Sequence, residues 1–477
     1  MPSTTDRSAP AFALVLLFVS SAVAGCIGTT EEEPLDPAAG ADAPSVVVPE
    51  VPSFDFATVV DPDHIAHHLP SLHQVGHGLD LVGYTAIQHA LPPTVRGSIT
   101  QVDVWSTYAV VAGMEGGLGF AIIDIADPAR PQVVSYFRAA ADGWTARFSD
   151  DGAYVFYGCQ ILGATGTLGG GTVRGDCTDP DSIHGGRAQG GIVAVDVQDK
   201  TAPKFVAYVP TRGAHNIQVA HIDGADHVFT NAVEIVRFDR AAGKLEIVAE
   251  VPGVHDATVA KHPITGDWLL YTGTNQLAIY NVNDPAAPSP VLEDGAATTA
   301  GWRDEMRGWH EQTVVPGVVD GRVLMVLAGE VFASPRGVPD IITIVDITDP
   351  TAPAVLGTWE PPFDSATPWI SYAFSAHEIA ATPTGQVAIA WYHAGAWVID
   401  VSTRERQAAP VTLAAYQPHN PITALPSTFV QTPAPMVPFV WGVGWDSRGY
   451  LLVPDMHTGL YVMEPAWGLH PAVDGGQ

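Results

Sequence analysis

A unit of strand, acidic turn and strand recurs along this chain and constrains its fold more than any other feature. The clear copies are FAIIDIADPARPQVVSYF from Phe120, IVAVDVQDKTAPKFVAYV from Ile192, LAIYNVNDPAAPSPVLE from Leu277 and ITIVDITDPTAPAVLGTW from Ile342. A looser copy, AWVIDVSTRERQAAPVTLAAY, starts at Ala396. Runs of β-branched residues favour buried strands. A repeat of this kind sets the architecture, because each unit buries its apolar face against the next one.

Each copy carries an acidic or amide residue where its first strand ends. Such side chains hydrogen-bond the backbone of their own turn, and the prolines that follow stop the strand ladder. A calcium site is the alternative, but one or two carboxylates per turn fall short of the 6–8 oxygen ligands that Ca²⁺ takes. We therefore interpret these residues as turn formers: Asp124, Asp196, Asn281, Asp346 and Asp400.

A second pair of strands precedes each unit, as in HDATVAKHPITGDWLLYTG from His255. Four strands per repeat are typical of a β-propeller blade. We expect seven blades, which begin near Ser98, Trp144, His215, His255, His310, His377 and Trp441. The seventh lacks a last strand, and LDLVGYTAI from Leu79 resembles the missing one. The sequence thus predicts an all-β, seven-bladed propeller over residues 79–467 that is closed by its N-terminal strand, which removes the exposed sheet edges.

The units resemble the LVIVD repeat of bacterial and archaeal surface proteins. The resemblance covers roughly Leu79 to Pro465 and is most specific in ITIVDITDPTAP and FAIIDIADPARP. It is weak in the third blade, where IVRFDRAAGKLEIVAEV lacks the proline turn. The resemblance implies a propeller at the cell surface, and it supplies no catalytic motif.

The N-terminal sequence has the features of an export signal. Residues 11–24 are almost continuously apolar and lead into Val23-Ala24-Gly25-Cys26, which resembles a prokaryotic lipobox. The apolar run is shorter than a membrane span requires. We expect a lipoprotein signal peptide over 1–25, a lipid on Cys26, and an extracytoplasmic chain attached to the cell membrane; an ordinary secretory signal is the alternative.

Residues 26–63, acidic and rich in proline, look like an extended tether. Residues 64–78 form a His-rich lead-in.

Two further cysteines, Cys159 and Cys177, remain once Cys26 carries lipid. Cysteines of exported proteins are commonly paired, so we predict one disulfide between them. Two unpaired thiols are the alternative.

The net charge argues against two kinds of surface as the main partner. The chain has 21 Lys and Arg against 51 Asp and Glu, a formal net charge of −30. Such an excess disfavours binding to a nucleic-acid backbone or an anionic lipid surface. The sequence has no Gly-x-Ser-x-Gly elbow, phosphate loop or Cys-x-x-Cys pair that would indicate a reaction.

Histidines recur at one position of the repeat. Four successive blades open with His and a polar residue: His215-Asn216, His255-Asp256, His310-Glu311 and His377-Glu378. Innermost strands line a propeller channel, so these positions are expected to form a ring at one depth. The loop between the second and third strands should reach the same end and holds Glu115, Glu330, His393 and His457. Such a set suits Zn, Cu, Fe or Ni. Alternatively, each His caps a carbonyl of the neighbouring blade, and its polar partner orients it or faces away.

Two functions remain open. The first is a surface binding or interaction protein that recognises a protein, peptide or glycan through inserted loops near residues 163–187, 296–307, 333–340 and 414–438. The second is a metal-dependent enzyme, an oxidoreductase or hydrolase, that uses the four histidines. Several tryptophans could line a ligand site or pack between blades: Trp144, Trp309, Trp369, Trp441 and Trp445.

Overall fold

The computed structural model describes residues 48–53, 75–93, 95, 97–114, 117–139, 142–160, 190–252, 256–272, 277–293, 309–330, 341–362, 375–392, 394–418 and 439–469. The chain divides into two units, Met1–Ser45 and Val46–Gln477. The first unit lies outside the described residues, so the following concerns the second.

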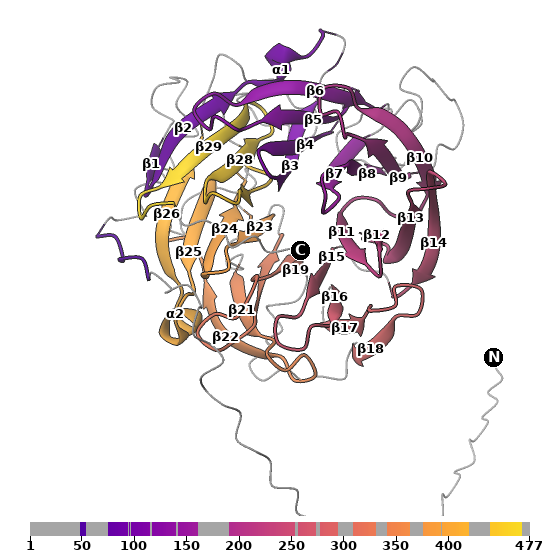
Figure 1. Cartoon of the computed structure of the whole chain (residues 1–477). Coiled ribbons are helices and arrows are strands. Elements are labelled where there is room, and N and C mark those ends of the chain that lie inside the picture. Colours follow the sequence, from indigo (N-terminus) through magenta and orange to yellow (C-terminus); the bar gives the residue numbers. More distant parts are fainter. Residues whose placement is uncertain are drawn as a thin grey trace, which may run out of the picture. The chain divides into compact units, whose positions relative to one another are not determined.

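Seven antiparallel sheets form a closed ring, as Figure 1 shows. The first three blades, with strands given from the channel outward, are β3 (Ser98–Trp105), β4 (Tyr108–Met114), β5 (Leu118–Asp124) and β6 (Gln132–Arg138); β7 (Asp142–Phe148), β8 (Tyr154–Gln160), β9 (Gly191–Asp196) and β10 (Lys204–Pro210); and β11 (Ile217–Ile222), β12 (Ala225–Thr230), β13 (Glu234–Asp239) and β14 (Lys244–Glu250).

The next three blades repeat the same order. They are β15 (Ala257–Lys261), β16 (Trp268–Thr272), β17 (Ala278–Asn281) and β18 (Ser289–Leu292); β19 (Trp309–Val314), β20 (Leu324–Gly329), β21 (Ile342–Asp346) and β22 (Ala354–Trp359); and β23 (Ile379–Ala381), β24 (Gln386–Ala390), β25 (Ala396–Asp400) and β26 (Val411–Gln417). The predicted seven-bladed propeller is therefore confirmed.

The seventh blade closes the ring with strands from both ends of the described chain. It contains β27 (Gly444–Trp445), β28 (Leu451–Asp455), β29 (Gly459–Pro465) and β2 (Leu79–Thr85). β2 runs antiparallel to β29, from the pair Leu79 and Pro465 to the pair Thr85 and Leu460. In Figure 1 the indigo β2 lies beside the yellow β29. The predicted closing strand is confirmed.

A short strand that the sequence analysis did not predict joins the sixth blade. β1 (Val75–His77) pairs antiparallel with β26 and makes this sheet five-stranded. Only Gly78 separates β1 from β2, and it has a φ of 76°, in the region that favours glycine. A Cβ there would lie 2.5 Å from the carbonyl oxygen of Leu413. The end of the predicted His-rich lead-in thus connects the outer edges of two neighbouring blades; its other histidines lie outside the described residues.

The acidic residues of the repeat form the turns, as predicted. A side-chain oxygen of each one accepts a hydrogen bond from the backbone nitrogen two residues later, at 2.8–3.2 Å: Asp124, Asp196, Asn281, Asp346 and Asp400. The second acidic residue of the turn does the same in four blades: Asp127, Asp199, Asp284 and Asp349. These bonds satisfy backbone nitrogens of the turns, as expected of turn-forming residues.

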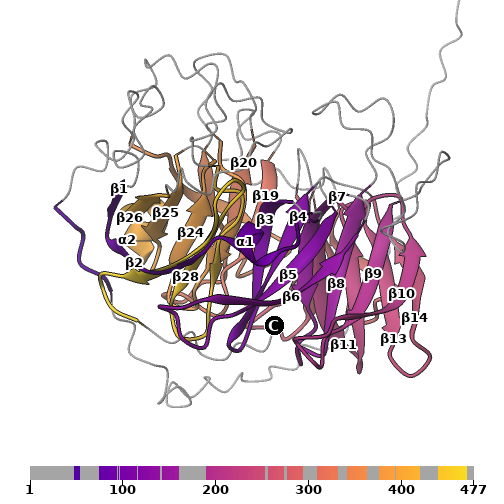
Figure 2. The same ribbon diagram turned by 90° about the horizontal axis from the view of Figure 1, so that it is seen from above.

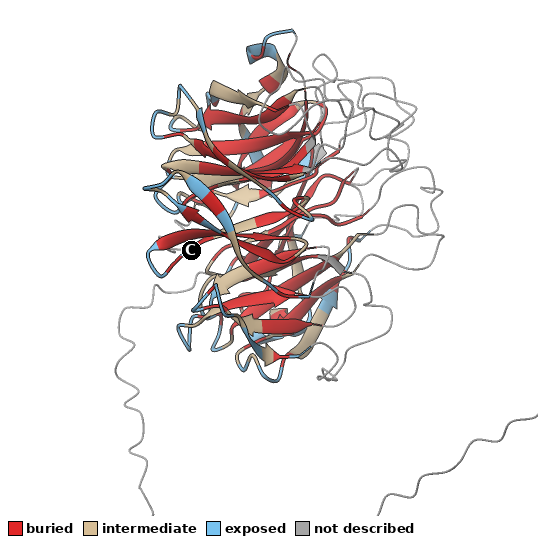
Figure 3. Cartoon of the chain, turned by 90° about the vertical axis from the view of Figure 1, so that its right-hand side faces the viewer, coloured by how far each residue is buried: buried red, intermediate tan, exposed pale blue. Residues whose placement is uncertain are grey.

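The core lies between adjacent blades, where Figure 3 shows the buried residues concentrated. Between the fifth and sixth blades, for example, Val326 and Ile344 pack with Ile389 and Trp397. Two short helices, α1 (Ile87–Ala90) and α2 (Arg404–Ala408), complete the described structure. No helix within it is long and apolar enough to cross a membrane.

The two ends of the ring differ in their connections. Strands alternate in direction, so the links from the second to the third strand of a blade, and from a fourth strand to the next blade, emerge at one end. We call this the insertion end and the opposite one the turn end; Figure 2 shows the strands standing side by side between them. The six longest connections between described strands are all at the insertion end: β2 to β3, β8 to β9, β18 to β19, β20 to β21, β22 to β23 and β26 to β27. The predicted inserted loops fall there, outside the described residues or at their edges.

Candidate binding site in the central channel

Aromatic rings meet where the innermost strands begin. The His215 and Trp144 rings lie 4.6 Å apart, Trp144 and Trp441 4.9 Å, and Trp441 and His377 4.2 Å, between centroids. These four residues, which we call the aromatic layer, come from the third, second, seventh and sixth blades. The first blade has the smaller Thr100 here, whose hydroxyl donates to the Trp144 carbonyl at 2.8 Å. Because Thr100 is small, tryptophans of the two flanking blades can meet.

His377 makes an inter-blade hydrogen bond. Its Nδ1 lies 2.9 Å from the carbonyl oxygen of Trp441 in the next blade, and the residue is buried. This is the hydrogen bond that the structural alternative for the repeated histidines supposes, and the role of His377 as a metal ligand stays a prediction. His215 lies at the other end of the tryptophan pair.

Below the aromatic layer, one residue further along each innermost strand, lies a ring of buried polar side chains. We call it the polar layer: Gln101, Thr145, Asn216, Asp256, Glu311 and Glu378, each at most 4% exposed. The seventh blade contributes Gly442, which has no side chain. The sequence analysis named four of these only as partners of histidines and missed Gln101 and Thr145. Each of these two directly follows the residue, Thr100 or Trp144, that takes the place of the histidine in its blade. This equivalence in the repeat was the signal that could have identified them.

Hydrogen bonds within the polar layer join both neighbouring blades and blades that have another blade between them. The Gln101 amide of the first blade donates to a carboxylate oxygen of Glu378 in the sixth. The Asn216 amide of the third blade donates to Glu311 in the fifth at 3.4 Å, and the Thr145 hydroxyl donates to the Asn216 oxygen at 3.4 Å. Two of these bonds therefore pass in front of an intervening blade.

Burial and like charge perturb the two glutamates. Burial raises the pKa of Glu378 to about 7; the charges of Asp256 and Glu330 act in the same direction, whereas Arg147 and the Gln101 hydrogen bond oppose them. Burial also raises the pKa of Glu311 well above its usual value, and the charges of Glu378 and Asp256 add to this effect. The polar layer consequently holds protons near neutral pH.

An ion pair borders the polar layer on the side of the turn end. Arg147 lies two residues beyond Thr145, 3.8 Å from a carboxylate oxygen of Asp103. Its Nε also donates to the Ile217 carbonyl at 3.4 Å. The side chains of Arg147 and Asp103 are 18% and 24% exposed, so water reaches this pair.

His457, in the loop between β28 and β29, is the most available of the predicted ligands. It is 3% exposed, its ring stacks on Phe439 at 6.1 Å, and its backbone nitrogen donates to Asp455 at 3.0 Å. Neither ring nitrogen has a hydrogen-bond partner in the described part of the chain. Glu330, from the same predicted set, accepts a hydrogen bond from the Tyr392 hydroxyl.

The proposed four-histidine site stays a prediction. His255, His393 and Glu115 lie outside the described residues, as does the side chain of His310. Among the side chains that the structure does describe, no three His, Cys, Asp or Glu residues converge closely enough to hold a metal ion.

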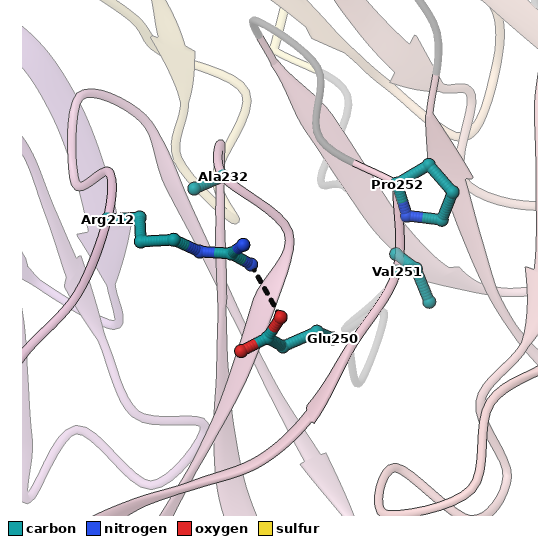
Figure 4. A pocket seen from close by; sticks show the side chains of 5 residues that line it. All are labelled: Arg212, Ala232, Glu250, Val251 and Pro252. Atoms are coloured by element: carbon teal, nitrogen blue, oxygen red, sulfur yellow. Dashed lines mark hydrogen bonds and ion pairs between the residues drawn. The ribbon is translucent and has the colours of Figure 1, made fainter.

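A shallow depression opens at the insertion end of the third blade (Figure 4). Arg212 and Glu250 face each other across it, 2.8 Å apart, with Ala232, Val251 and Pro252 around them. Glu234 also lies 3.4 Å from the guanidinium. With two carboxylates beside it, this arginine does not form an anion site, and none of the lining residues belongs to the polar layer.

A family comparison matches two blades of the propeller. The model of the LVIVD repeat matches residues 96–138, which contain β3 to β6, and residues 340–360, which contain β21 and β22. The chain contains LVIVD repeats. No curated protein matches the sequence.

Solved structures similar to this LVIVD-repeat chain include three of low sequence identity. They are Sqt1 of Saccharomyces cerevisiae (9% identity, TM-score 0.44, 78% of this chain and 82% of that one), the WD40 propeller domain of Doa1 (12%, 0.45, 81% and 96%) and the propeller domain of Cps50 (Swd1) from Myceliophteria thermophila (12%, 0.47, 79% and 100%).

Other predicted residues of the LVIVD-repeat chain lie as follows. Cys159 is buried at the end of β8, whereas Cys177 and Cys26 fall outside the described residues, so the disulfide and the lipidation stay predictions. Trp445 donates from Nε1 to the Ala380 carbonyl of the sixth blade at 3.3 Å, which is inter-blade packing. Trp369 and the side chain of Trp309 are not described.

Proposed function

We propose that this chain is a lipid-anchored protein of the cell surface that binds a protein, peptide or glycan through the insertion end of its propeller. The position of the insertions carries the proposal. All six of the longest connections between described strands leave at that end. Loops on a rigid scaffold are the usual place for binding residues, because they vary without disturbing the core.

The turn end supports the same assignment by contrast. Its connections are short, and side-chain hydrogen bonds such as those of Asp124 and Asp346 hold them. Backbone that is satisfied in this way packs regularly and offers few variable side chains. Recognition is therefore expected at one end of the ring.

Photo-cross-linking tests which end binds. A photoreactive phenylalanine analogue replaces Pro252, exposed at the insertion end, or Ile264, 54% exposed at the turn end. In cells that express the full chain, we expect cross-linked products from position 252 and few from position 264. Products that form mainly from position 264 would contradict the proposal.

Detergent partitioning tests the anchor. The apolar segment before Cys26 and the lipobox-like residues support lipidation of its thiol. The wild-type chain should enter the detergent phase of Triton X-114, and Cys26→Ser should remain in the aqueous phase. Thr29→Ser, three residues further on, is the matched control and should behave as wild type. Equal partitioning of the Cys26 variant and the wild type would remove the anchor from the proposal.

A metal-dependent enzyme, an oxidoreductase or a hydrolase, is the second candidate. Its support is His457, whose buried ring offers two nitrogens to a ligand. Metal analysis of the purified full chain should give about one Zn, Cu, Fe or Ni per molecule, lost in His457→Ala and His377→Ala. The control is His221→Ala, whose side chain is 39% exposed at the turn end. Absence of stoichiometric metal from the wild type would exclude this candidate.

A further inference from the structure

The connection between β25 and β26 departs from the repeat. Four other blades have an acidic turn with proline at this place, as in ADPARP of the first blade and TDPTAP of the fifth. The sixth blade has the helix α2 there instead. Thr403 caps this helix, because its hydroxyl oxygen accepts a hydrogen bond from the backbone nitrogen of Arg406 at 3.3 Å. A helix of five residues is too short to be stable alone, so neighbouring residues must hold it in place.

The fifth blade supplies that support. The backbone nitrogen of Arg404 donates a hydrogen bond to the Asp320 carboxylate at 2.8 Å. Gln407, which is fully buried, donates from its amide nitrogen to the Val319 carbonyl at 3.1 Å and accepts from the Arg322 guanidinium at 3.0 Å. The three partners lie between β19 and β20, in the turn-end connection of the fifth blade. α2 is therefore a fixed part of the turn end that is joined to two blades.

One side chain of α2 binds the N-terminal part of the described chain. Arg406 donates from a guanidinium nitrogen to the Pro49 carbonyl oxygen at 2.9 Å. Pro49 is buried, whereas Val48 and Glu50 on either side of it are exposed. The same guanidinium forms an ion pair with Asp400, whose side chain has no exposed surface, and the Arg406 side chain is itself only 16% exposed. This segment of chain is thus attached to the ring at a defined place, by a buried proline and a hydrogen bond from a charged donor.

The place of this contact matters, because the next described residue that the ring holds lies at its other end. α2 connects the third strand of its blade to the fourth, so it lies at the turn end. Val75, which begins β1, pairs with Gln417, the last residue of β26, and therefore lies at the insertion end. While Pro49 is bound, the chain that precedes it joins the ring at the turn end. If Pro49 were released, Val75 would be the first described residue that the ring holds.

We propose that Arg406, Asp400 and α2 form a clamp for the chain's own Pro49, and that this clamp turns the insertion end of the propeller away from the membrane. The orientation rests on the proposed lipid on Cys26, whereas the clamp itself does not. A membrane attachment that joins the ring at its turn end keeps that end on the membrane side. The inserted loops then face outward, where a protein, peptide or glycan has access to them.

The chain before the clamp is short compared with the ring. Residues 27–47 separate Cys26 from Val48, which is 47 − 26 = 21 residues. As the tether that the sequence predicts, a chain of that length has a root-mean-square span of about 25 Å. A strand of seven residues, such as β4, is about 23 Å long. The two ends of the ring should therefore differ in their mean distance from the membrane by about as much as the tether spans.

Electron paramagnetic resonance tests the clamp without a lipid. A nitroxide is attached to Val48→Cys in the full chain that carries Cys26→Ser. The double variant Asp400→Asn/Arg406→Gln opens the clamp and leaves no buried charge unpaired. Arg404→Gln, on the same helix but bound to the fifth blade, is the matched control. The rotational correlation time of the label should fall at least about twofold in the double variant and stay as in the wild type in the control.

A second variant opens the clamp from its other side. Pro49→Gly removes the buried proline while Arg406 and Asp400 keep each other, and it should mobilise the label in the same way. Val51→Gly is its control, because Val51 is 55% exposed and the substitution adds the same backbone freedom. Circular dichroism establishes that each variant is folded. A label that is as mobile in the wild type as in both clamp variants would overturn the proposal.

Energy transfer tests the orientation. The lipidated full chain is reconstituted in phosphatidylcholine vesicles that carry an acceptor dye on some headgroups. A donor dye is attached to Ile264→Cys at the turn end or to Pro252→Cys at the insertion end, both exposed positions. Transfer should be stronger from position 264, and Pro49→Gly should reduce or reverse the difference.

The outcomes separate the clamp from the anchor. Stronger transfer from position 252 in the wild type, or a difference that Pro49→Gly leaves unchanged, would overturn the orientation. A wild-type chain that does not bind the vesicles would show that the proposed lipid anchor is wrong. The mobility of the label would then decide the clamp by itself, since that measurement uses a chain without lipid.

Discussion

Replacing Glu378 by Gln should make the propeller more stable at alkaline pH than the wild type. The folded-state pKa of Glu378 is raised from 4.5 to about 7, chiefly by burial. Below the unfolded-state pKa the group is protonated in both states and has no effect. As the pH rises from 4.5 to about 7, ionisation of the carboxyl group lowers the free energy of the unfolded chain but not that of the folded chain. The difference between the two pKa values therefore corresponds to a loss of about 3 kcal/mol in the free energy of unfolding, at 1.36 kcal/mol per pH unit.

The measurement is urea unfolding of both proteins at pH 5 and pH 8. Part of the effect is already present at pH 5, so the wild type should lose about 2–3 kcal/mol relative to the variant between the two values. Glutamine keeps an oxygen that can accept the hydrogen bond from Gln101, so the fold is preserved. Removing the charge also lessens the repulsion on Glu311, which acts in the same direction.

Glu246→Gln is the control for the change from acid to amide. Its side chain is 64% exposed beside Lys244, and its pH dependence should follow the wild type. Parallel pH dependences of wild type and Glu378→Gln, or a variant that is less stable at pH 8, would show that the channel does not disfavour the ionised carboxylate. The reasoning about the polar layer would then fail.

Two further predictions concern the ring itself. Gly78→Ala should destabilise the fold by about 3 kcal/mol or more, because it combines a left-handed backbone with a Cβ 2.5 Å from a carbonyl oxygen. Gly224 has a φ of 75° but no atom within 4 Å of its Cβ position, so Gly224→Ala should cost only about 1 kcal/mol. Thermal or urea unfolding measures both. Arg240→Ala should cost about 3 kcal/mol, because it removes the guanidinium from the fully buried carboxylate of Asp226, whereas Lys244→Ala breaks an exposed pair and should stay within about 0.5 kcal/mol.

The sequence was sufficient for the architecture because the information that defines a blade is local. Each copy carries its own strand pattern and turn formers, such as Asp124 and Asp346, whose hydrogen bonds lie within three residues of chain. The closing strand was predictable because Leu79–Thr85 has the pattern of an outer strand. β1 has only three residues, Val-Gly-His, too few for any periodicity. Its pairing with β26 depends on a neighbour far along the chain.

Part of the predicted ring lies within the described residues, and the four-histidine metal site stays a prediction. Equivalent positions do form a ring, and His377 and His215 lie in it as expected. The residue after each histidine was given two possible roles, to orient the imidazole or to face away. In the structure two of these residues bond side chains two blades away, Asn216 to Glu311 and Glu378 to Gln101. A strand pattern defines which residues alternate, but not how far a side chain extends across a space whose width depends on the other blades.

Small residues in single blades decide which side chains of other blades come into contact. A prediction based on the repeat misses these contacts, because the small residues are departures from the repeat. Thr100 of the first blade leaves room for Trp144 and Trp441 from its two sides. One residue further along the strands, Gly442 of the seventh blade leaves room in the same way for Gln101 and Glu378. A Cβ on Gly442 would lie 3.0 Å from the Cα of Gln101. The departures from the repeat, rather than its regular positions, therefore place an amide beside a buried carboxylate and give the channel its chemistry.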